Sequence, residues 1–483
     1  MMFRMMYLVV PCILAGSALA EVDHWFTIKL AGTPAGWAHS VETLAGDVRT
    51  MTNTESMKIG RMNAEVTVTS KTVWEDRLDG TPISMEWTQE MGDQPVRTRW
   101  DFGGGEMKIT MEQGGRVTTS TRPAPTTPWL TPAAVIDRLA ALADAGETEF
   151  SWYVMVPDLG ATPALQTMQH SGGGVLTVNG AEYEVSSWDV TVEGLPVSIK
   201  TSFSPDWRPV MSTIRTPFGD IESKRSSKSV ALGERIGPAP ELFATLFVRP
   251  VSGTIEDQST ASRAFLRLRT LDGTTLDLPA SGAQSIAGYQ GNTVLLQVDR
   301  SSGSSPQEER TQFDQYRSGS TMIDSSDAAI TELAARVIST LPQEASVAER
   351  AEALREAVYR WISKKGLTTA FASASETVRS HEGDCSEHGV LLAAMLRAEG
   401  IPSRVASGLV WMDGLDAFGW HMWTQAFIDG QWIDLDATLS VPFTVGHILV
   451  ATSALEDGDG QRELLALLGL LGNLEVEVVR VDL

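Results

Sequence analysis

The sequence predicts a multi-domain chain in which a β-rich N-terminal domain and a small β module precede a C-terminal α+β domain. Its length of 483 residues suggests about three domains. Short runs of β-branched and aromatic residues, separated by glycine-rich turns, dominate the first half. After about residue 324, apolar residues recur three and four positions apart, which is the spacing of helices. The change from strands to helices indicates a separate C-terminal domain.

The first twenty residues have the pattern of a secretory signal peptide. A cationic start at Arg4 precedes an apolar run over 5–16, and Ala18-Leu19-Ala20 fits cleavage after Ala20. The apolar run is shorter than the ~20 residues of a membrane span. The two residues before Cys12 are not the small residues that a lipoprotein signal needs. We therefore expect a secreted or periplasmic mature protein with no integral membrane segment after cleavage.

The β-rich domain is predicted over 21–236. Segments such as 64–69 and 183–188 read as strands, and glycine turns between such segments favour a large antiparallel sheet or half-barrel. One helix interrupts them, because Thr131 is a suitable N-cap, Pro132 suits the first helical position, and apolar residues follow at helical spacing up to residue 145. This region shows no pattern typical of catalysis, and its role is left open.

A proline-rich segment at 237–240 marks the next boundary. A small β module and linker are predicted over 237–305, with strands near 264–269 and 293–298. The α+β domain is then predicted over 306–483. Its first long helices are expected at 328–341 and 347–364, where apolar residues form one stripe on each helix.

Composition excludes some partners and cofactors. The formal net charge is −23, so the surface repels phosphates and nucleic acid is not an expected partner. The chain has 2 cysteines and 7 histidines, and these lack the usual zinc spacing. It also has no calcium-binding loop of the EF-hand type. We therefore expect no metal and no cofactor.

Once the signal peptide is removed, Cys385 is the single cysteine left, in Gly383-Asp384-Cys385-Ser386-Glu387-His388. Asp384 is a suitable N-cap, an almost wholly apolar stretch follows, and Gly400 suits the end of a helix. Cys385 is thus predicted in the first turn of a buried helix. The free amides and the dipole at that position favour an anion, and they can also stabilise an oxyanion during acyl transfer.

A nucleophilic thiol needs a base, and the base needs an orienting group. His421 lies on a predicted strand that turns back at Asp429-Gly430, a strong hairpin signal. The two-residue turn places Ile428 opposite Gln431 and Gln425 opposite Asp434, which puts His421 diagonal to Asp436, with about 7–8 Å between backbones. Asp436 is therefore the preferred orienting carboxylate and Asp434 the alternative.

Together, these segments resemble the transglutaminase-like core superfamily, whose fold is related to papain. The resemblance rests on 383–388, Gly400-Ile401-Pro402-Ser403-Arg404, 421–424 and Trp432-Ile433-Asp434-Leu435-Asp436-Ala437-Thr438, and it covers about 324–453. It implies Cys385 as the nucleophile, His421 as the general base and acid, and Asp436 as the orienting group. No side chain upstream of Cys385 matches the family's oxyanion-hole residue.

Several residues have alternative interpretations. Cys385 as an inert buried thiol is the ordinary interpretation of a lone cysteine, but its context favours catalysis. His388 is interpreted as a helix-surface or structural residue, and His447 as a residue at a strand edge. Trp411 and Trp423 are candidates for substrate binding in a peptide groove, although core packing is an equally good interpretation.

The predicted function is a cysteine-dependent protease, amidase or acyltransferase that attacks an amide or peptide bond in a protein or peptide substrate, for which components of the cell envelope are candidates. The triad does not distinguish hydrolysis from transfer to an amine. Resemblance to bacterial proteins of this layout favours hydrolysis slightly. The alternative is a non-catalytic envelope protein whose β domains bind a ligand or partner.

Overall fold

The computed structural model describes residues 22–61, 64–90, 95–216, 219–233, 247–303, 313–365, 372–458, 467 and 469–483. The predicted signal peptide and the boundary at 237–240 lie outside these ranges. The chain divides into two compact units, of which the first is Met1–Leu242 with Gly458–Leu465 and the second is Phe243–Asp457 with Ala466–Leu483. None of the described helices combines the length and hydrophobicity that crossing a membrane requires.

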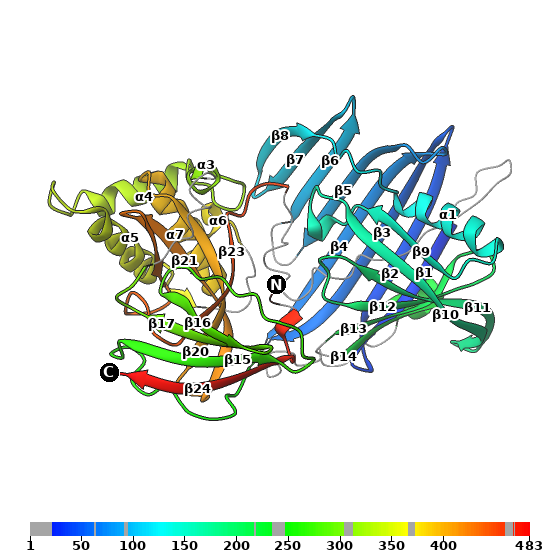
Figure 1. Ribbon diagram of the computed structural model, residues 1–483. Coiled ribbons are helices and arrows are strands. Elements are labelled where there is room, and N and C mark those ends of the chain that lie inside the picture. Colours follow the sequence, from blue (N-terminus) through cyan, green and yellow to red (C-terminus); the bar gives the residue numbers. More distant parts are fainter. Residues whose placement is uncertain are drawn as a thin grey trace. The chain divides into compact units, whose positions relative to one another are not determined.

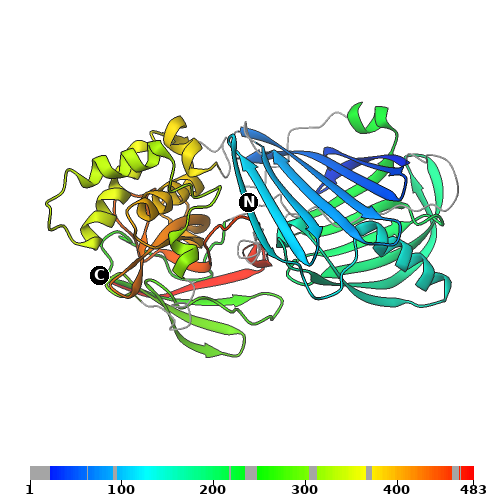
Figure 2. The ribbon, with the colours of Figure 1, turned by 90° about the horizontal axis from the view of Figure 1, so that it is seen from above.

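The first unit is built on one antiparallel sheet of 14 strands, as the alternating sequence pattern predicts. Two meanders, β1–β8 and β9–β14, join through the pairing of β1 with β14, so that β8 and β9 form the two ends. Figures 1 and 2 show this sheet curling on itself. The strands are β1 (Val22–Leu30), β2 (Thr33–Ala45), β3 (Val48–Arg61), β4 (Ala64–Arg77), β5 (Pro82–Glu90), β6 (Val96–Gly103), β7 (Glu106–Gln113), β8 (Arg116–Pro123), β9 (Glu149–Val154), β10 (Ala164–Val178), β11 (Ala181–Val192), β12 (Ser198–Phe203), β13 (Pro209–Thr216) and β14 (Gly219–Ser226).

The helix predicted after Thr131 is α1 (Pro132–Asp144). The Thr131 hydroxyl accepts a hydrogen bond from the Ala134 amide, and Pro132 occupies the first turn, where its missing N–H costs no hydrogen bond. Ala133 of α1 packs with Trp74 and Trp100 in a core cluster beneath the sheet. The short elements η1 (Pro157–Leu159) and α2 (Lys228–Gly233) complete the unit.

The second unit contains two four-stranded antiparallel sheets and a short parallel pair. One sheet has the order β16-β17-β15-β24, and the other has the order β22-β21-β20-β23. The strands are β15 (Arg263–Thr270), β16 (Gln284–Gln290), β17 (Thr293–Asp299), β18 (Lys364–Lys365), β19 (Glu382–Gly383), β20 (Ser403–Met412), β21 (Ala417–Ile428), β22 (Gln431–Leu435), β23 (His447–Ser453) and β24 (Leu474–Asp482).

The helices of this unit gather around α7, as Figure 1 shows. They are α3 (Phe313–Arg317), α4 (Ala328–Ile338), α5 (Val347–Trp361), α6 (Ala374–Ser380) and α7 (Cys385–Ala398). α7 packs against β20 and β21 on one side and against α4, α5 and α6 on others, so it is buried along most of its length. A Cβ at Gly389 would stand 3.3 Å from the carbonyl oxygen of Trp423, and the Thr424 hydroxyl donates to the Gly389 carbonyl at 2.9 Å. The missing side chain at Gly389 therefore lets the helix approach β21 closely.

The small β module and the α+β domain form one compact unit, which differs from the separate domains predicted over 237–305 and 306–483. Two long-range contacts explain this. The module's sheet takes its fourth strand, β24, from the far C-terminal segment. The loop before β16 also contacts the second sheet, because the amide of Ala283 donates a hydrogen bond to Asp434 of β22 at 2.7 Å. Neither contact has a local sequence signal.

Candidate active site

Cys385 is the first residue of α7, the position predicted for it, and its side chain is partly exposed. Asp384 is the N-cap and accepts from the Ser386 amide at 2.8 Å. Glu387 completes a capping box by accepting from the Asp384 amide at 2.8 Å. The Asp384-x-x-Glu387 spacing was a further signal of this helix start in the sequence. The cap leaves the Cys385 amide free of any intrahelical acceptor, so it is available to stabilise an oxyanion.

Burial of Glu387 raises its pKa to about 8, and the nearby Asp384 carboxylate adds to the rise. Glu387 is fully buried. At neutral pH it is therefore mainly uncharged, because a second negative charge beside Asp384 would be costly to bury. The helix start thus carries less negative charge than its sequence suggests.

His421 lies on β21, and the hairpin that follows has the predicted register. Ile428 pairs with Gln431 and Gln425 pairs with Asp434. The turn residues Asp429 and Gly430 have φ values of 50° and 84°, as a type I′ turn requires. This register brings the His421 side chain to Asp436, the first residue after β22, where Nε2 lies 2.7 Å from Oδ2.

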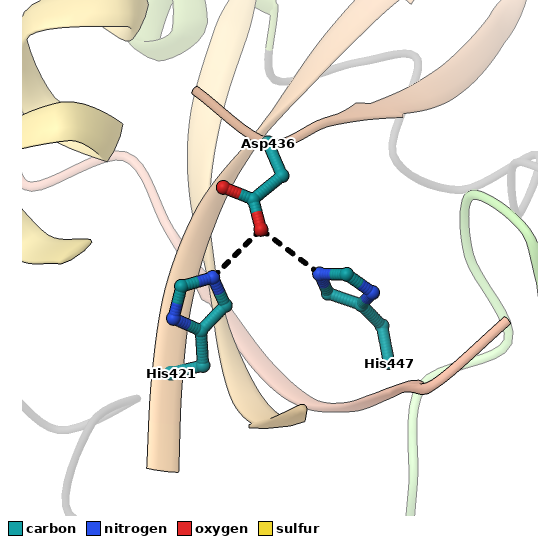
Figure 3. Close-up of side chains that lie close together, drawn as sticks. All are labelled: His421, Asp436 and His447. Atoms are coloured by element: carbon teal, nitrogen blue, oxygen red, sulfur yellow. Dashed lines mark hydrogen bonds and ion pairs between the residues drawn. The ribbon is translucent and has the colours of Figure 1, made fainter. Parts of the chain in front are cut away.

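Asp436 is fully buried and accepts hydrogen bonds on both oxygens. Oδ2 lies 2.7 Å from Nε2 of His421 and 3.1 Å from Nε2 of His447 (Figure 3). Oδ1 accepts from the Thr438 amide at 2.7 Å and from the Thr438 hydroxyl at 2.6 Å. Burial alone would raise the pKa of Asp436, but the charge and hydrogen bond of His421, helped by His447, hold it well below its usual range. Asp436 is therefore an anion at neutral pH.

His421 interacts with both of its predicted partners. Its Nε2 is hydrogen-bonded to Asp436 at 2.7 Å, and Cys385 lies near enough to contribute to its raised pKa. Because Nε2 faces Asp436, Nδ1 is the ring nitrogen left for the thiol. Burial alone lowers the pKa of His421, but the Asp436 carboxylate, with a further contribution from Cys385, outweighs burial and raises the pKa to about 10. The imidazole is thus held as a cation between an anionic orienting group and the sulfur.

Asp434, the alternative orienting group, has a different set of contacts. Its Oδ1 accepts from the indole N–H of Trp423 and from the side-chain amide of Gln425, both at 2.8 Å. Its Oδ2 accepts from the Ala283 amide. A Cβ at Gly282 would lie 2.0 Å from the same oxygen, so only glycine lets the loop approach so closely. Asp434 therefore links β22 and β21 to the β module through hydrogen bonds. Asp436, and not Asp434, is the carboxylate that is hydrogen-bonded to His421.

The proposed substrate-binding tryptophans require correction. Trp411 is 3% exposed and Trp423 is 1% exposed, so neither lines an open groove. Trp411 packs edge-on against Phe418. The Trp423 ring lies beside the His421 ring on the same face of β21, with 6.2 Å between ring centroids and an angle of 18° between ring planes. Both tryptophans are core side chains.

His388 also differs from its expected place, since it is buried and not on the helix surface. It lies one turn after Cys385, and its Nδ1 is 2.6 Å from the Asp384 carbonyl oxygen. Burial is the main cause that lowers the pKa of His388, so it is a neutral ring at neutral pH. The structural interpretation of His388 agrees with this packing.

His447 is the site residue that the sequence did not indicate. It is the first residue of β23, which is an edge strand as expected, but its ring is buried and turned toward Asp436. Its Nδ1 lies 3.0 Å from both the hydroxyl and the carbonyl oxygen of Thr444, so both ring nitrogens face oxygen acceptors. No spacing rule connects His447 with Asp436, because an irregular loop separates them.

His421, Asp436 and His447 also form a group of the type that binds metals, with their ligand atoms within 4.8 Å of one another. Metal binding needs unprotonated imidazoles. The raised pKa of His421 works against this, because its Nε2 proton is held by the carboxylate. Hydrogen bonds account for these contacts, and the expectation of no metal requirement stays a prediction that chelator-insensitive activity would support.

We expect His447 to act as a positioning residue for Asp436. His447→Phe should lower the rate of acyl transfer about tenfold or more, because a hydrogen bond to a charged group contributes about 1.5–3 kcal/mol. Loss of this donor leaves Asp436 a stronger partner for the His421 cation, so the alkaline limb of the pH–rate profile should move upward. His447→Gln, which retains an N–H donor, should recover most of the activity. An unchanged alkaline limb in the Phe variant would mean that His447 only fills space.

A family model matches part of the second unit. Residues 331–437, which include Cys385, His421 and Asp436, match the model of the transglutaminase-like superfamily. No curated protein sequence matches the chain.

Three solved structures show distant similarity to the chain. A β-barrel-like protein with a domain of unknown function from Brucella abortus has 11% identity and a TM-score of 0.33, covering 43% of this chain and 96% of that one. A putative cysteine protease from Cytophaga hutchinsonii has 16% identity and a TM-score of 0.29, covering 46% and 84%. A putative protease from Parabacteroides distasonis has 12% identity and a TM-score of 0.19, covering 75% and 68%. With the family match over residues 331–437, the resemblance seen in the sequence is confirmed, and the second unit carries a transglutaminase-like domain.

Proposed function

We propose that the chain is an exported enzyme that cleaves or transfers amide acyl groups through a thioester on Cys385. The transglutaminase-like domain supports an enzyme at the level of the superfamily. The signal-like pattern at 1–20 supports export to the periplasm or the outside of the cell. Protein or peptide amides are the substrates that suit a thiol nucleophile with an adjacent cationic acid.

One observation carries the proposal, namely that His421 is hydrogen-bonded to Asp436 while the neighbouring Cys385 thiol contributes to its raised pKa. Nucleophile, base and orienting group thus stand in the order that activation of a thiol requires. The same arrangement would be an unusual accident for an inert thiol, because burying a charged pair without function is costly.

In the first half-reaction, the Cys385 thiolate attacks the carbonyl carbon of the substrate amide, and the carbonyl electrons move to its oxygen. The Cys385 amide is placed to donate to this oxyanion. The carbon–nitrogen bond then breaks as the carbonyl re-forms, and the His421 imidazolium gives its proton to the leaving amine. The products of this step are a thioester on Cys385 and a free amine.

In the second half-reaction, His421 accepts a proton from the incoming nucleophile, which attacks the thioester carbonyl carbon. The carbon–sulfur bond breaks and the thiolate returns beside the imidazolium. Water as the nucleophile gives a carboxylic acid, and an amine gives a new amide. The charge held on His421 serves both outcomes, because Asp436 stabilises the imidazolium in either case.

The first test is the pH dependence of Cys385 alkylation by iodoacetamide in the mature chain, in which Cys385 is expected to be the only thiol. Labelling should be fast well below pH ~8.5, where a free thiol ionises. His421→Ala should remove this fast labelling, because the cation beside the sulfur is lost. His24→Ala, which changes a histidine of the first unit, is the matched control and should behave like the wild type. Slow labelling that rises only near the pH of a free thiol, in wild type and variant alike, would contradict the proposal.

A further inference from the structure

The curled sheet of the first unit encloses a cavity that has no part in the chemistry of Cys385. Its volume is about 110 Å³, and its walls come from β1–β4, from β10–β14, from α1 and from residues 154–157. A cavity needs about 10–15 Å³ to hold one water molecule, so this cavity is several times larger than the space of a single trapped water. Cavities of this kind, with mostly apolar walls and a few polar groups, are typical of ligand sites.

One wall of the cavity carries a row of polar side chains across three strands. Ser40 of β2 pairs with Asn53 of β3, and Asn53 pairs with Thr72 of β4, so the three share one face of the sheet. Thr72 is 3% exposed, and its hydroxyl has no hydrogen-bond partner among the residues that the structure describes. A buried hydroxyl without a partner is costly, and a ligand group with a hydrogen-bonding atom would satisfy it.

Glu55 stands beside this row, two residues after Asn53 on the same face of β3. Within the described ranges, its carboxyl group makes no hydrogen bond or ion pair. Burial raises the pKa of Glu55 to about 8, and the buried carboxylate of Asp158 adds to the rise. Burial in the cavity therefore disfavours the negative charge of Glu55, and a cationic ligand beside the carboxyl group would favour that charge. Among the described residues that line the cavity, His39 is the one titratable residue besides Glu55, and it pairs with Asp23 at 2.8 Å.

The remaining walls are apolar. They come from β10–β14 and from α1, and no lysine or arginine is among the described residues that line the cavity. The main apolar side chains are Phe26, Ile136, Met168, Val190, Phe203 and Ile214. The site thus combines one acidic, hydrogen-bonding wall with hydrocarbon and aromatic surfaces, a combination that suits a cation on an apolar body and rejects an anion.

We propose that this cavity binds a small primary amine with an apolar body. The ammonium group would pair with the carboxylate of Glu55 and donate to the hydroxyl of Thr72, while the hydrocarbon part fills the space toward α1. A neutral alcohol would satisfy Thr72 but not Glu55, and a carboxylate would have to bury its own negative charge with no cationic side chain among the described lining residues. The site is independent of the thiol chemistry, since all of its walls belong to the first unit.

The test is calorimetric titration of the mature full-length chain at pH 7 with hexylamine, hexanol and hexanoate. Hexylamine should bind at least tenfold more tightly than hexanol, and hexanoate should not bind. Because Glu55 must lose its proton to pair with the ammonium, titrations in two buffers of different ionisation enthalpy should show release of up to about one proton. Glu55→Gln should weaken hexylamine binding about tenfold or more and abolish proton release. Thr72→Val should weaken it severalfold, and Glu182→Gln, at an exposed site on β11, should change nothing.

Three results would overturn the proposal. They are the absence of saturable hexylamine binding, equal affinities for hexylamine and hexanol, and a folded Glu55→Gln protein with wild-type affinity. Circular dichroism and the melting temperature identify variants that fail to fold. If Glu55→Gln is among these, the Thr72→Val variant and the proton release of the wild type decide the question. Amine binding in this cavity does not depend on Cys385. Slow alkylation of Cys385 would therefore contradict the proposed function without affecting this proposal.

Discussion

Replacing Cys385 with alanine is expected to abolish acyl transfer while the fold is retained. In enzymes with a catalytic triad, removal of the nucleophile lowers kcat by about 10⁶-fold. Cys385 begins a helix whose cap is supplied by Asp384 and Glu387, so the cap survives the change. The measurement is hydrolysis of a casein digest followed by mass spectrometry, with intact-protein mass spectrometry to detect the thioester in the wild type.

Cys12→Ala is the matched control for this experiment, since it changes the other cysteine of the sequence within the predicted signal peptide. The mature protein made from that gene should show wild-type activity. A Cys385→Ala protein that still forms a covalent acyl adduct, or that cleaves the digest at the wild-type rate, would exclude the thioester mechanism.

Replacing Asp436 with asparagine is expected to have the next largest effect. A neutral amide cannot balance the His421 cation, and loss of the orienting aspartate in a triad lowers kcat by about 10⁴-fold. The pKa of His421 should fall from about 10 to below its ordinary value, because burial then dominates. The fast alkylation of Cys385 below pH ~8.5 should therefore be lost together with activity.

The free energy of unfolding should depend on pH through the interaction of His421 with Asp436. Asp436→Asn should remove this dependence on the alkaline side. The folded pKa of His421 is raised from 6.5 to about 10, so its stabilising contribution is complete below pH 6.5 and is lost as pH rises through about 10. The lowered pKa of Asp436 gives a contribution that is present above its ordinary value of 3.8 and is lost as pH falls further. In Asp436→Asn the loss of stability on the alkaline side should disappear.

The measurement is urea unfolding of wild type and Asp436→Asn at several pH values from acid to alkaline, with the difference in unfolding free energy plotted against pH. That difference should be largest near neutral pH and should shrink toward both extremes. Thr438→Val, which removes one donor to the same carboxylate but keeps its charge, should show a smaller difference with the same alkaline trend. A difference that does not depend on pH would mean that the carboxylate and the imidazole do not interact as charges.

Local signals predicted the parts of the site that depend on neighbouring residues. The cap at Asp384 and the left-handed Gly400, with φ of 74°, define both ends of α7. The Asp429-Gly430 turn fixes the register that carries His421 to Asp436. These features depend on backbone geometry within a few residues, so the residue types at those positions are enough to predict them.

The parts that the sequence could not predict depend on contacts between distant segments. His447 reaches Asp436 only because β23 pairs with β20, which no short motif encodes. Asp434 stayed an alternative to Asp436 in the sequence because its contact with the Ala283 amide, which gives it a structural role, comes from the module's distant loop. Trp411 and Trp423 could be assigned to the core only when the surrounding sheets were in place.

The pairing of β24 with β15 bears on when the candidate site is assembled. These strands are separated by about two hundred residues, so the sheet that contacts the hairpin of His421 is complete only after the chain beyond residue 474 has joined it. Until then β15 has an open edge, and the loop that binds Asp434 lacks its full support. Closure of such a long loop makes folding slow. A chain folding in the order of its synthesis would therefore complete the candidate site only after β24 has paired with β15.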